Sequence, residues 1–383
     1  MSISSALRQG IVDTALAAGF DLAGLAPVPS DDSDLGILQS QRFLDWASRG
    51  HAGEMAWMLR SGEDGVLLRS SLTRAVPWVK SVILCALNYN ADQPRSIDPA
   101  PAGTGWIARY AWSGSDGIPT DYHDTMLGRL HTVEGYLHQN LQNVQTRCYV
   151  DTGPVVERWL AQLAGIGWIG KNTCVLNQEQ GSFLLLGVIL ISEPLQEEAV
   201  LLPAADRCGT CTRCVDACPT DALVAPRQMD ASRCIAYLTI EKKGIIDPAL
   251  APMMGRQVFG CDICQDVCPW NRRAPFGTAA DMQARVELVN PPLEELAAMD
   301  TPAFKRRFKG SPLERTGRRR LQRNVAIAMG NSGDTGHRHR LEQWAGGEDA
   351  MLAETAQRAL LQLEENTEPP LLASCEPPQE PTV

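Results

Sequence analysis

Residues 208–219 read C-G-T-C-T-R-C-V-D-A-C-P, and this stretch decides the central part of the fold. Its cysteines stand at C-x2-C-x2-C-x3-C-P, the run with which bacterial ferredoxins bind 4Fe–4S clusters. The fourth cysteine of such a run ligates the other cluster in two-cluster proteins. A second run, C-D-I-C-Q-D-V-C-P, follows at 261–269. It lacks its first cysteine at the usual place, and Cys234, 27 residues before Cys261, can supply it.

The two runs predict two clusters with reciprocal ligands. One cluster would be bound by Cys208, Cys211, Cys214 and Cys268, and the other by Cys218, Cys234, Cys261 and Cys264. Zinc also binds paired cysteines at this spacing, but it gives no reason for two runs that each end in Cys-Pro. The spacing therefore favours clusters. The other cysteines have no ligand spacing; they are Cys85, Cys148, Cys174 and Cys375. The first two lie in apolar segments, and we expect them to be core thiols.

Composition sets the limits within which this module is placed. The chain has 383 residues, enough for two or three domains, and is 44% hydrophobic, enough for a sizeable core. Its net charge of −10 argues against binding nucleic acid over the whole surface and leaves room for a local basic patch. The start lacks the apolar stretch of a signal peptide, and the longest apolar run, 183–191, is far shorter than the roughly 20 residues that cross a bilayer. We therefore expect a cytoplasmic protein without membrane contact, whose cysteines are not paired as disulfides.

The pattern of apolar residues divides the chain into four parts. Residues 1–200 alternate between helical and strand patterns, which favours an α/β domain. Within them we expect helices at 4–18, 41–49, 121–143 and 155–164, and strands at 22–25, 81–87, 146–150 and 182–191. The last of these strands is apolar on both faces, as in a central strand. The other parts are a ferredoxin-like domain at 201–290, a helical domain at 291–365 with helices at 313–329, 338–344 and 351–363, and a disordered tail at 366–383.

The segment 304–323 is strongly basic within an acidic protein. It holds nine lysines and arginines against one acid, Glu314. Such an asymmetry is a plausible phosphate-binding surface, although a solvated basic face is the usual explanation of a charge run. The candidates for contact with a nucleic-acid backbone are Arg318, Arg319, Arg320 and Arg323.

Several motifs together resemble the epoxyqueuosine reductase family. The two most specific are Cys-Pro-Trp-Asn at 268–271 and V-D-T-G-P-V-V-E-R-W-L-A-Q-L-A-G-I-G-W-I-G-K-N-T at 150–173. Further similar pieces are Arg109-Tyr110, Asp121-Tyr122-His123, C-I-A-Y-L-T-I-E at 234–241 and R-R-R-L-Q-R-N-V-A-I-A-M-G-N at 318–331. The resemblance covers about residues 1–365 in order. It departs from the family pattern at 111–120, a longer connection than usual.

The resemblance implies a cobalamin-binding α/β domain, a bacterial-ferredoxin-like domain with two 4Fe–4S clusters, and a C-terminal α-helical, HEAT-like domain that helps to hold tRNA. The implied reaction is the last step of queuosine biosynthesis. In that step epoxyqueuosine at the wobble position of a tRNA anticodon stem-loop loses its epoxide oxygen by two-electron reduction. An external donor such as a flavodoxin or ferredoxin would supply the electrons to a monomeric enzyme. The alternatives are a cobalamin-dependent reductive dehalogenase of small molecules and an electron carrier that uses only the clusters.

The resemblance also implies site residues. Asp151 would protonate the epoxide oxygen, as a buried acid with a raised pKa beside the cobalamin. Its residue type alone would favour a cap of the following helix over this role, and the resemblance reverses that order. Arg109, Lys171 and Asn172 would contact the cobalamin, the last two after a glycine-rich turn that lets backbone approach a flat ligand. His123 is not expected to ligate cobalt, because its segment lacks the glycine of the D-x-H-x-x-G motif.

Overall fold

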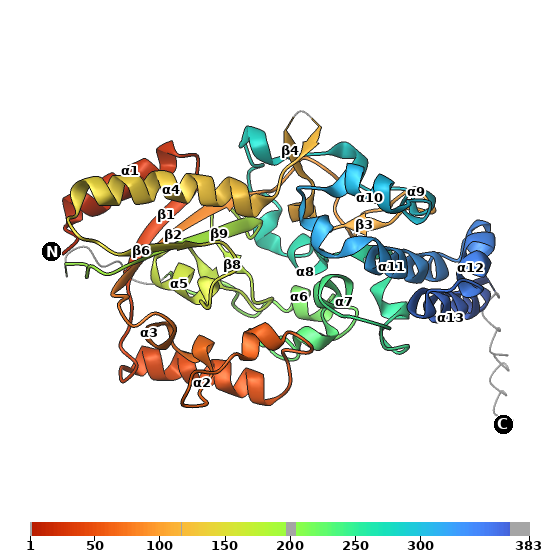
Figure 1. Ribbon diagram of the computed structural model, residues 1–383, viewed down its shortest axis with the longest axis horizontal. Coiled ribbons are helices and arrows are strands. Elements are labelled where there is room, and N and C mark those ends of the chain that lie inside the picture. The colour runs from red at the N-terminus through yellow and green to blue at the C-terminus, as the bar shows by residue number, and fades with distance from the viewer. Residues whose placement is uncertain (1, 116, 197–203, 368–383) are drawn as a thin grey trace, which may run out of the picture.

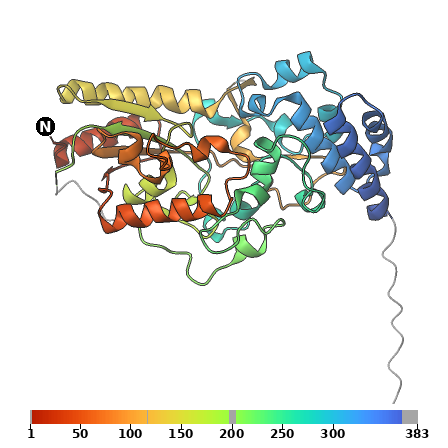
Figure 2. The same cartoon turned by 60° about the horizontal axis from the view of Figure 1, so that its bottom comes forward.

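The structure is a computed structural model that describes residues 2–115, 117–196 and 204–367. Three parts follow one another along its long axis (Figure 1). A sheet with its covering helices lies at the N-terminal end, the cysteine-rich segment lies in the middle, and a group of helices forms the other end. The turned view in Figure 2 shows the same order, with α2 in front of the sheet.

The main sheet has four strands in the order β1-β2-β9-β6, and every neighbouring pair is antiparallel. The predicted central strand is β9, which lies between β2 and β6. The expected alternation of helices and strands is present, but the sheet is not the parallel one that strict α/β alternation favours. The strands are β1 (Leu22–Pro27), β2 (Ser81–Asn88), β6 (Thr146–Tyr149) and β9 (Leu184–Ile191).

Both faces of this sheet are covered, because alternate side chains of a strand point to opposite faces. On β2, Ile83 and Cys85 pack in the core that includes Met126 of α4, whereas Val82 and Leu84 pack in the core on the other face. The predicted core position of Cys85 is confirmed. The helices above the sheet in Figure 1 are α1 (Ser5–Ala17) and α4 (Tyr122–Asn140), and those below it are α2 (Asp34–Ser48), α3 (Leu72–Ala75) and α5 (Glu157–Leu163).

The cysteine-rich segment contains only short elements, as expected where ligands rather than periodic apolar residues organise the chain. They are α6 (Arg213–Asp216), α7 (Ile235–Ile240), β10 (Gln257–Phe259) and α8 (Ile263–Asp266). β10 pairs in parallel with β3 (Trp106–Ile107), so part of the first 200 residues leaves the sheet. Trp106 and Trp112 are buried in the same core as α11. The N-terminal region and the C-terminal helices therefore share a hydrophobic core.

The C-terminal helices pack around α11, which is buried at every position from 321 to 330. The predicted helices of this region are all present, with small shifts at their ends. They are α9 (Leu293–Ala297), α10 (Thr301–Phe308), α11 (Gly317–Asn331), α12 (Arg338–Ala345) and α13 (Ala350–Thr367). The predicted disordered tail began at 366, but residues 366–367 belong to α13, and 368–383 lie outside the described residues.

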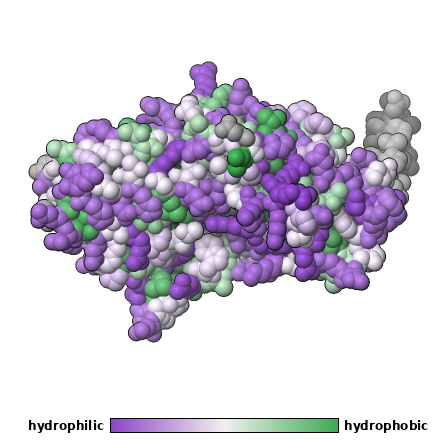
Figure 3. Space-filling view, turned by 45° about the horizontal axis from the view of Figure 1, so that its top comes forward, coloured by the Kyte–Doolittle hydropathy of each residue, from purple (hydrophilic) through white to green (hydrophobic). Residues whose placement is uncertain are grey.

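Two small sheets complete the chain. The long connection at 111–120 forms a hairpin that pairs with a segment after the cysteine-rich region, through β4 (Ser113–Ser115), β5 (Ile118–Pro119) and β11 (Gln283–Ala284). The second sheet consists of β7 (Trp168–Ile169) and β8 (Val175–Leu176). Among the described helices none is long and apolar enough to span a membrane. Figure 3 shows a mainly hydrophilic face with apolar side chains in small, separate patches.

Candidate functional site

The first predicted cysteine group combines Cys208 and Cys211 from the loop before α6, Cys214 within α6, and Cys268 just after α8. Burial raises the pKa of Cys268 to about 11, and the nearby Cys214 and Cys208 thiols add to that rise. Burial also raises the pKa of Cys214, and the Cys208 and Cys211 thiols add to that rise. Trp168 donates a hydrogen bond from Nε1 to Cys208 Sγ at 3.5 Å, and Trp168 also packs against Trp270. The two tryptophan rings thus pack beside Cys208 and Cys268, whereas Cys211 and Cys214 are partly exposed.

The second group lies around the N-terminus of α7, and its four cysteines are partly buried. Burial raises the pKa of the Cys261 thiol well above its usual range, and Cys234 and Cys218 contribute. The pKa of Cys264 is also raised well above its usual range, first by its hydrogen bond with Cys174 and by burial, and then by Cys261 and Cys234. Sequence spacing missed a ninth cysteine here, since Cys174 is hydrogen-bonded to Cys264. No spacing signal could have found it, because Cys174 comes from the loop after β7.

A cavity of about 240 Å³ is lined by all four cysteines of the first group. Lys171 and Asn172 lie in its wall, with Leu176 and Trp270. Lys171 Nζ donates to the Gly209 carbonyl at 2.7 Å. Asn172 donates to the Cys264 carbonyl at 3.3 Å, so both residues tie their turn to the cysteine-rich segment.

The glycine-rich turn before Lys171 serves a different purpose from the predicted one. A Cβ on Gly167 would meet the carbonyl oxygen of Leu176 at 2.1 Å, and one on Gly170 would meet the Leu176 side chain at the same distance. These glycines permit close packing of β7 on β8 within the chain. The prediction that they admit a flat ligand is therefore corrected.

Asp151 lies directly after β6, exposed and in the left-handed region with φ 55°. Tyr122, the first residue of α4, donates its hydroxyl to Asp151 Oδ2 at 3.1 Å. The alternative role as a helix cap is wrong, because α5 begins only at Glu157, after Val156, and has no side-chain cap. The expected burial of Asp151 is also wrong.

A second, partly buried carboxyl at this place is Glu157. Its Oε1 accepts a hydrogen bond from the Asp151 backbone N–H at 2.8 Å. Burial raises the pKa of Glu157 to about 7, and the Asp151 carboxylate adds to the rise. Arg69 is also near, with its guanidinium 5.0 Å from the ring centroid of Trp57. Two carboxyl groups in different environments thus lie side by side, and the motif at 150–173 contained the second one unnoticed.

A bridge to the C-terminal helices lies beside Tyr122. Arg315 donates from its guanidinium to His123 Nε2 at 3.0 Å. Because a guanidinium only donates, Nε2 must accept, and the proton on Nδ1 is directed at Asp121. Both ring nitrogens of His123 are engaged within the chain. Tyr110 packs edge-on against Tyr122 with ring centroids 5.9 Å apart, which extends the group towards β10.

Arg109 does not face a ligand. It is 4% exposed, and its guanidinium donates to the Ala91 carbonyl at 2.6 Å and lies 4.9 Å from the ring centroid of Trp112. Its backbone N–H donates to Asp262, whose pKa is raised, mainly by burial. The predicted contact of Arg109 with cobalamin is therefore corrected to a structural role between the sheet domain and the cysteine-rich segment.

The four arginines predicted to contact nucleic acid fall into two pairs with different surroundings. Arg323 is fully buried and donates to the carbonyls of Leu238 at 2.6 Å and Gly244 at 2.7 Å. Arg320 donates to the Ile240 carbonyl at 2.6 Å. These two arginines anchor α11 to α7 and are corrected to structural residues. The other two remain at the surface, Arg319 paired with Asp349 and Arg318 bonded to Gln322.

Free positive charge lies instead around α10. Lys305, Arg306 and Lys309 are exposed, and none of them has an acidic partner within the parts of the chain that the structure describes. Arg315 is exposed as well and reaches the His123 side of the site. A basic surface thus leads from α10 towards Asp151.

Two groups of four cysteines beside a carboxylate site define a two-cluster iron–sulfur oxidoreductase. A family model described as a 4Fe–4S double cluster binding domain matches residues 207–271, and one described as epoxyqueuosine reductase QueG matches residues 69–152. A curated epoxyqueuosine reductase of Synechocystis sp. is 40% identical over 79% of this chain and 98% of its own length. That of Xanthomonas campestris is 37% identical over 82% of this chain and 84% of its own. The chain belongs to the epoxyqueuosine reductase family.

Solved structures agree with this assignment. A crystal structure of an epoxyqueuosine reductase with an epoxyqueuosine-modified tRNA-Tyr stem loop superposes with a TM-score of 0.81 at 28% identity, over 94% of this chain and 90% of that chain. The enzyme of Bacillus subtilis superposes with a TM-score of 0.76 at 25% identity, over 93% and 99%. That structure is described as having its catalytic aspartate loop swung out of the active site.

Proposed function

We propose that this chain reduces epoxyqueuosine to queuosine at the wobble position of tRNA. The observation that carries the proposal is the exposed Asp151 carboxyl, held by Tyr122 between the sheet domain, the cysteine groups and the basic surface, in a chain of this family. A family relative binds an epoxyqueuosine-modified stem loop, and another has a catalytic aspartate on a loop that moves. Asp151 is the aspartate at the corresponding kind of loop here.

The chemistry assigns Asp151 a proton. Removal of the epoxide oxygen takes two electrons and two protons and gives an olefin and water. The alkoxide formed when the ring opens is a poor leaving species until it is protonated, and Asp151 is positioned to donate that proton. Tyr122 and the Glu157–backbone hydrogen bond hold the carboxyl in place from two sides. A carboxyl that is exposed can also take up a new proton from water after each turnover.

The electrons would enter from an external flavodoxin or ferredoxin and pass through the two clusters. Cys208, Cys211, Cys214 and Cys268 would hold one cluster, and Cys218, Cys234, Cys261 and Cys264 the other. Cobalamin is the remaining proposed cofactor, and bound there it would supply a strongly reducing, nucleophilic cobalt. Lys171 and Asn172 are its proposed polar contacts, next to the cavity that the four cysteines of the first group also line.

The basic surface would hold the stem loop. RNA loops can splay a base out of the stack, so phosphate contacts at α10 would leave the modified base free to reach Asp151. We assign this role to Lys305, Arg306, Lys309 and Arg315, with Arg318 and Arg319 beside them. The described helices after residue 291 form the proposed HEAT-like, tRNA-holding domain of a monomer.

The test is turnover by Asp151→Asn. The protein is loaded with iron and cobalamin under anaerobic conditions and is then given a strong reductant and tRNA that carries epoxyqueuosine. The tRNA is digested, and the masses of its nucleosides are measured by mass spectrometry. Wild type should remove one oxygen mass, and Asp151→Asn should lose at least about 100-fold in rate, the usual contribution of a general acid. The matched control is Asp13→Asn on the exposed face of α1.

Normal turnover by Asp151→Asn with full cofactors would remove Asp151 from the mechanism. An unchanged nucleoside with the fully loaded wild type would sink the tRNA substrate. Reduction of a free halogenated small molecule by that same preparation would then favour the dehalogenase alternative.

A further inference from the structure

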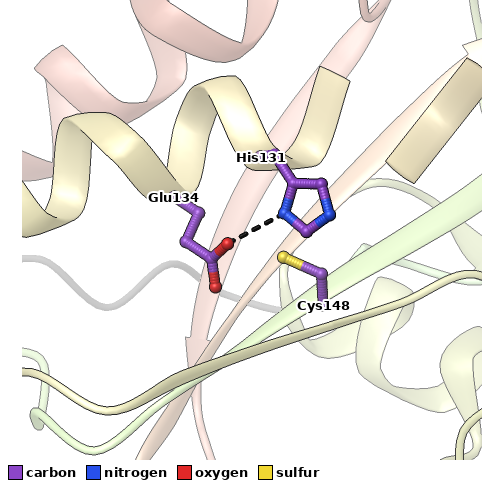
Figure 4. A group of neighbouring side chains, drawn as sticks. All are labelled: His131, Glu134 and Cys148. Carbon is purple, nitrogen blue, oxygen red and sulfur yellow. Dashed lines mark hydrogen bonds and ion pairs between the residues drawn. The ribbon is translucent and has the colours of Figure 1, made fainter. Parts of the chain in front are cut away.

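Three side chains of metal-binding type converge on α4 and the neighbouring edge strand β6. His131 and Glu134 lie one turn apart on the helix, and Cys148 comes from the strand (Figure 4). All three point towards one another, and their ligand atoms lie within 4.8 Å of each other. The prediction that Cys148 is a core thiol is met only in part, because this residue is partly exposed.

The surrounding hydrogen bonds resemble those of a supported metal site. His131 Nδ1 lies 2.9 Å from Glu134 Oε2. Thr146 donates to the other carboxylate oxygen of Glu134 at 2.6 Å. His138, on the same helix face, lies 3.0 Å from Thr146 Oγ1 through its Nε2. Metal-binding carboxylates are usually held by such outer partners, which fix the orientation of the ligand.

We propose that His131, Glu134 and Cys148 form a zinc site, with water as the fourth ligand. Nitrogen, oxygen and sulfur donors together suit Zn²⁺, whose ligand bonds are about 2.0–2.3 Å long. The three donors need to move inwards by only a small amount, and the 61% exposed His131 side chain is free to do so. The carboxylate and a thiolate neutralise the two positive charges of the ion.

A hydrogen-bonded surface group without metal is the competing explanation. It accounts for the pair of His131 and Glu134, which is an ordinary i, i+3 contact on a helix. It also accounts for part of the position of Cys148, whose thiol is hydrogen-bonded to Glu134. What favours a metal is that nitrogen, oxygen and sulfur donors from two elements converge within 4.8 Å of one another. Zinc there would fasten α4 to β6, whose ends carry Tyr122 and lead into Asp151. This inference stands apart from the proposed reaction, and its test does not measure turnover.

The experiment uses the full chain with both clusters loaded, kept without oxygen so that no cluster cysteine is vacant. Zn²⁺ is added together with a chelator that competes for it and so sets the free zinc concentration. The zinc and iron bound per chain are then measured in the same sample. We expect one zinc per chain at unchanged iron, and an X-ray absorption edge that reports one sulfur among nitrogen and oxygen ligands. His131→Ala and Cys148→Ser should weaken binding by about 100-fold or more, since loss of an outer partner alone costs 10–100-fold.

Two further variants keep the result decisive. Glu134→Gln preserves the shape and the Thr146 hydrogen bond but removes the charge, so it should weaken zinc binding even if the other variants fold poorly. His339→Ala, an exposed histidine on α12, is the matched control and should bind as wild type does. Absence of zinc from the wild type would overturn the site. Zinc binding as strong as that of the wild type in both Glu134→Gln and Cys148→Ser would overturn it as well.

Discussion

Replacing Glu157 by glutamine should stabilise the loop that carries Asp151, and more so as pH rises. The carboxyl of Glu157 is partly buried, and this burial raises its pKa from 4.5 to about 7. Between these two pH values the folded chain therefore holds a proton that the unfolded chain has lost. Stability contributed by this residue falls as pH rises through that window, because the unfolded state binds fewer protons.

The size of the effect follows from the shift. One pKa unit corresponds to about 1.4 kcal/mol, so ionising Glu157 in the folded state costs about 3 kcal/mol in full. Between pH 5.5 and 8 about 1.5 units of this window are crossed, which gives about 2 kcal/mol. Glutamine has no charge to bury and keeps an oxygen that can accept the Asp151 N–H. The variant should thus match wild type more closely at pH 5.5 than at pH 8.

Hydrogen exchange of the iron-loaded protein measures this locally, since peptides covering 150–163 report the opening free energy of the loop and α5. Wild type and Glu157→Gln are compared at the same pH, so the intrinsic exchange rate cancels. Glu179→Gln, an exposed carboxyl, should show no pH-dependent difference. An equal difference between Glu157→Gln and wild type at pH 5.5 and pH 8 would refute the reasoning.

Three other predictions concern residues whose surroundings became known only from the structure. Arg323→Met should destabilise the chain by about 1–3 kcal/mol for each buried carbonyl that loses its donor, as denaturant unfolding would measure. The affinity of the folded variant for tRNA should stay unchanged. Lys305→Glu with Arg306→Glu should weaken stem-loop binding and lower the slope of log K against log salt by about two, whereas an unchanged slope in a salt titration would place the RNA elsewhere. Cys174→Ser should retain all iron by chemical analysis, since both groups of four cysteines stay complete; loss of iron would make Cys174 a ligand.

Sequence reasoning succeeded where the signal was local. The spacing of the cysteines predicted which thiols lie together, and apolar periodicity predicted most helices and strands. It failed where the answer depended on tertiary contacts. Arg323 looks like a surface charge because its neighbours are also arginines, yet α7 buries it. Asp151 is predicted to be buried, yet the turn after β6 exposes it, and the partly buried carboxyl beside it is Glu157. Pairing of β3 with β10 joins segments about 150 residues apart, which periodicity cannot detect.

The anchoring of α11 on α7 has a consequence for how the chain matures. Cys234 stands at the N-terminus of α7, and Arg320 and Arg323 bind the carbonyls at and beyond the end of that helix. The wall around the second cysteine group is therefore unfinished until the ribosome has made residue 331 and α11 can dock. Iron delivered earlier would meet a second cysteine group that is still open to water. A chain shortened before α11 should accordingly be recovered with the first cluster retained more readily than the second.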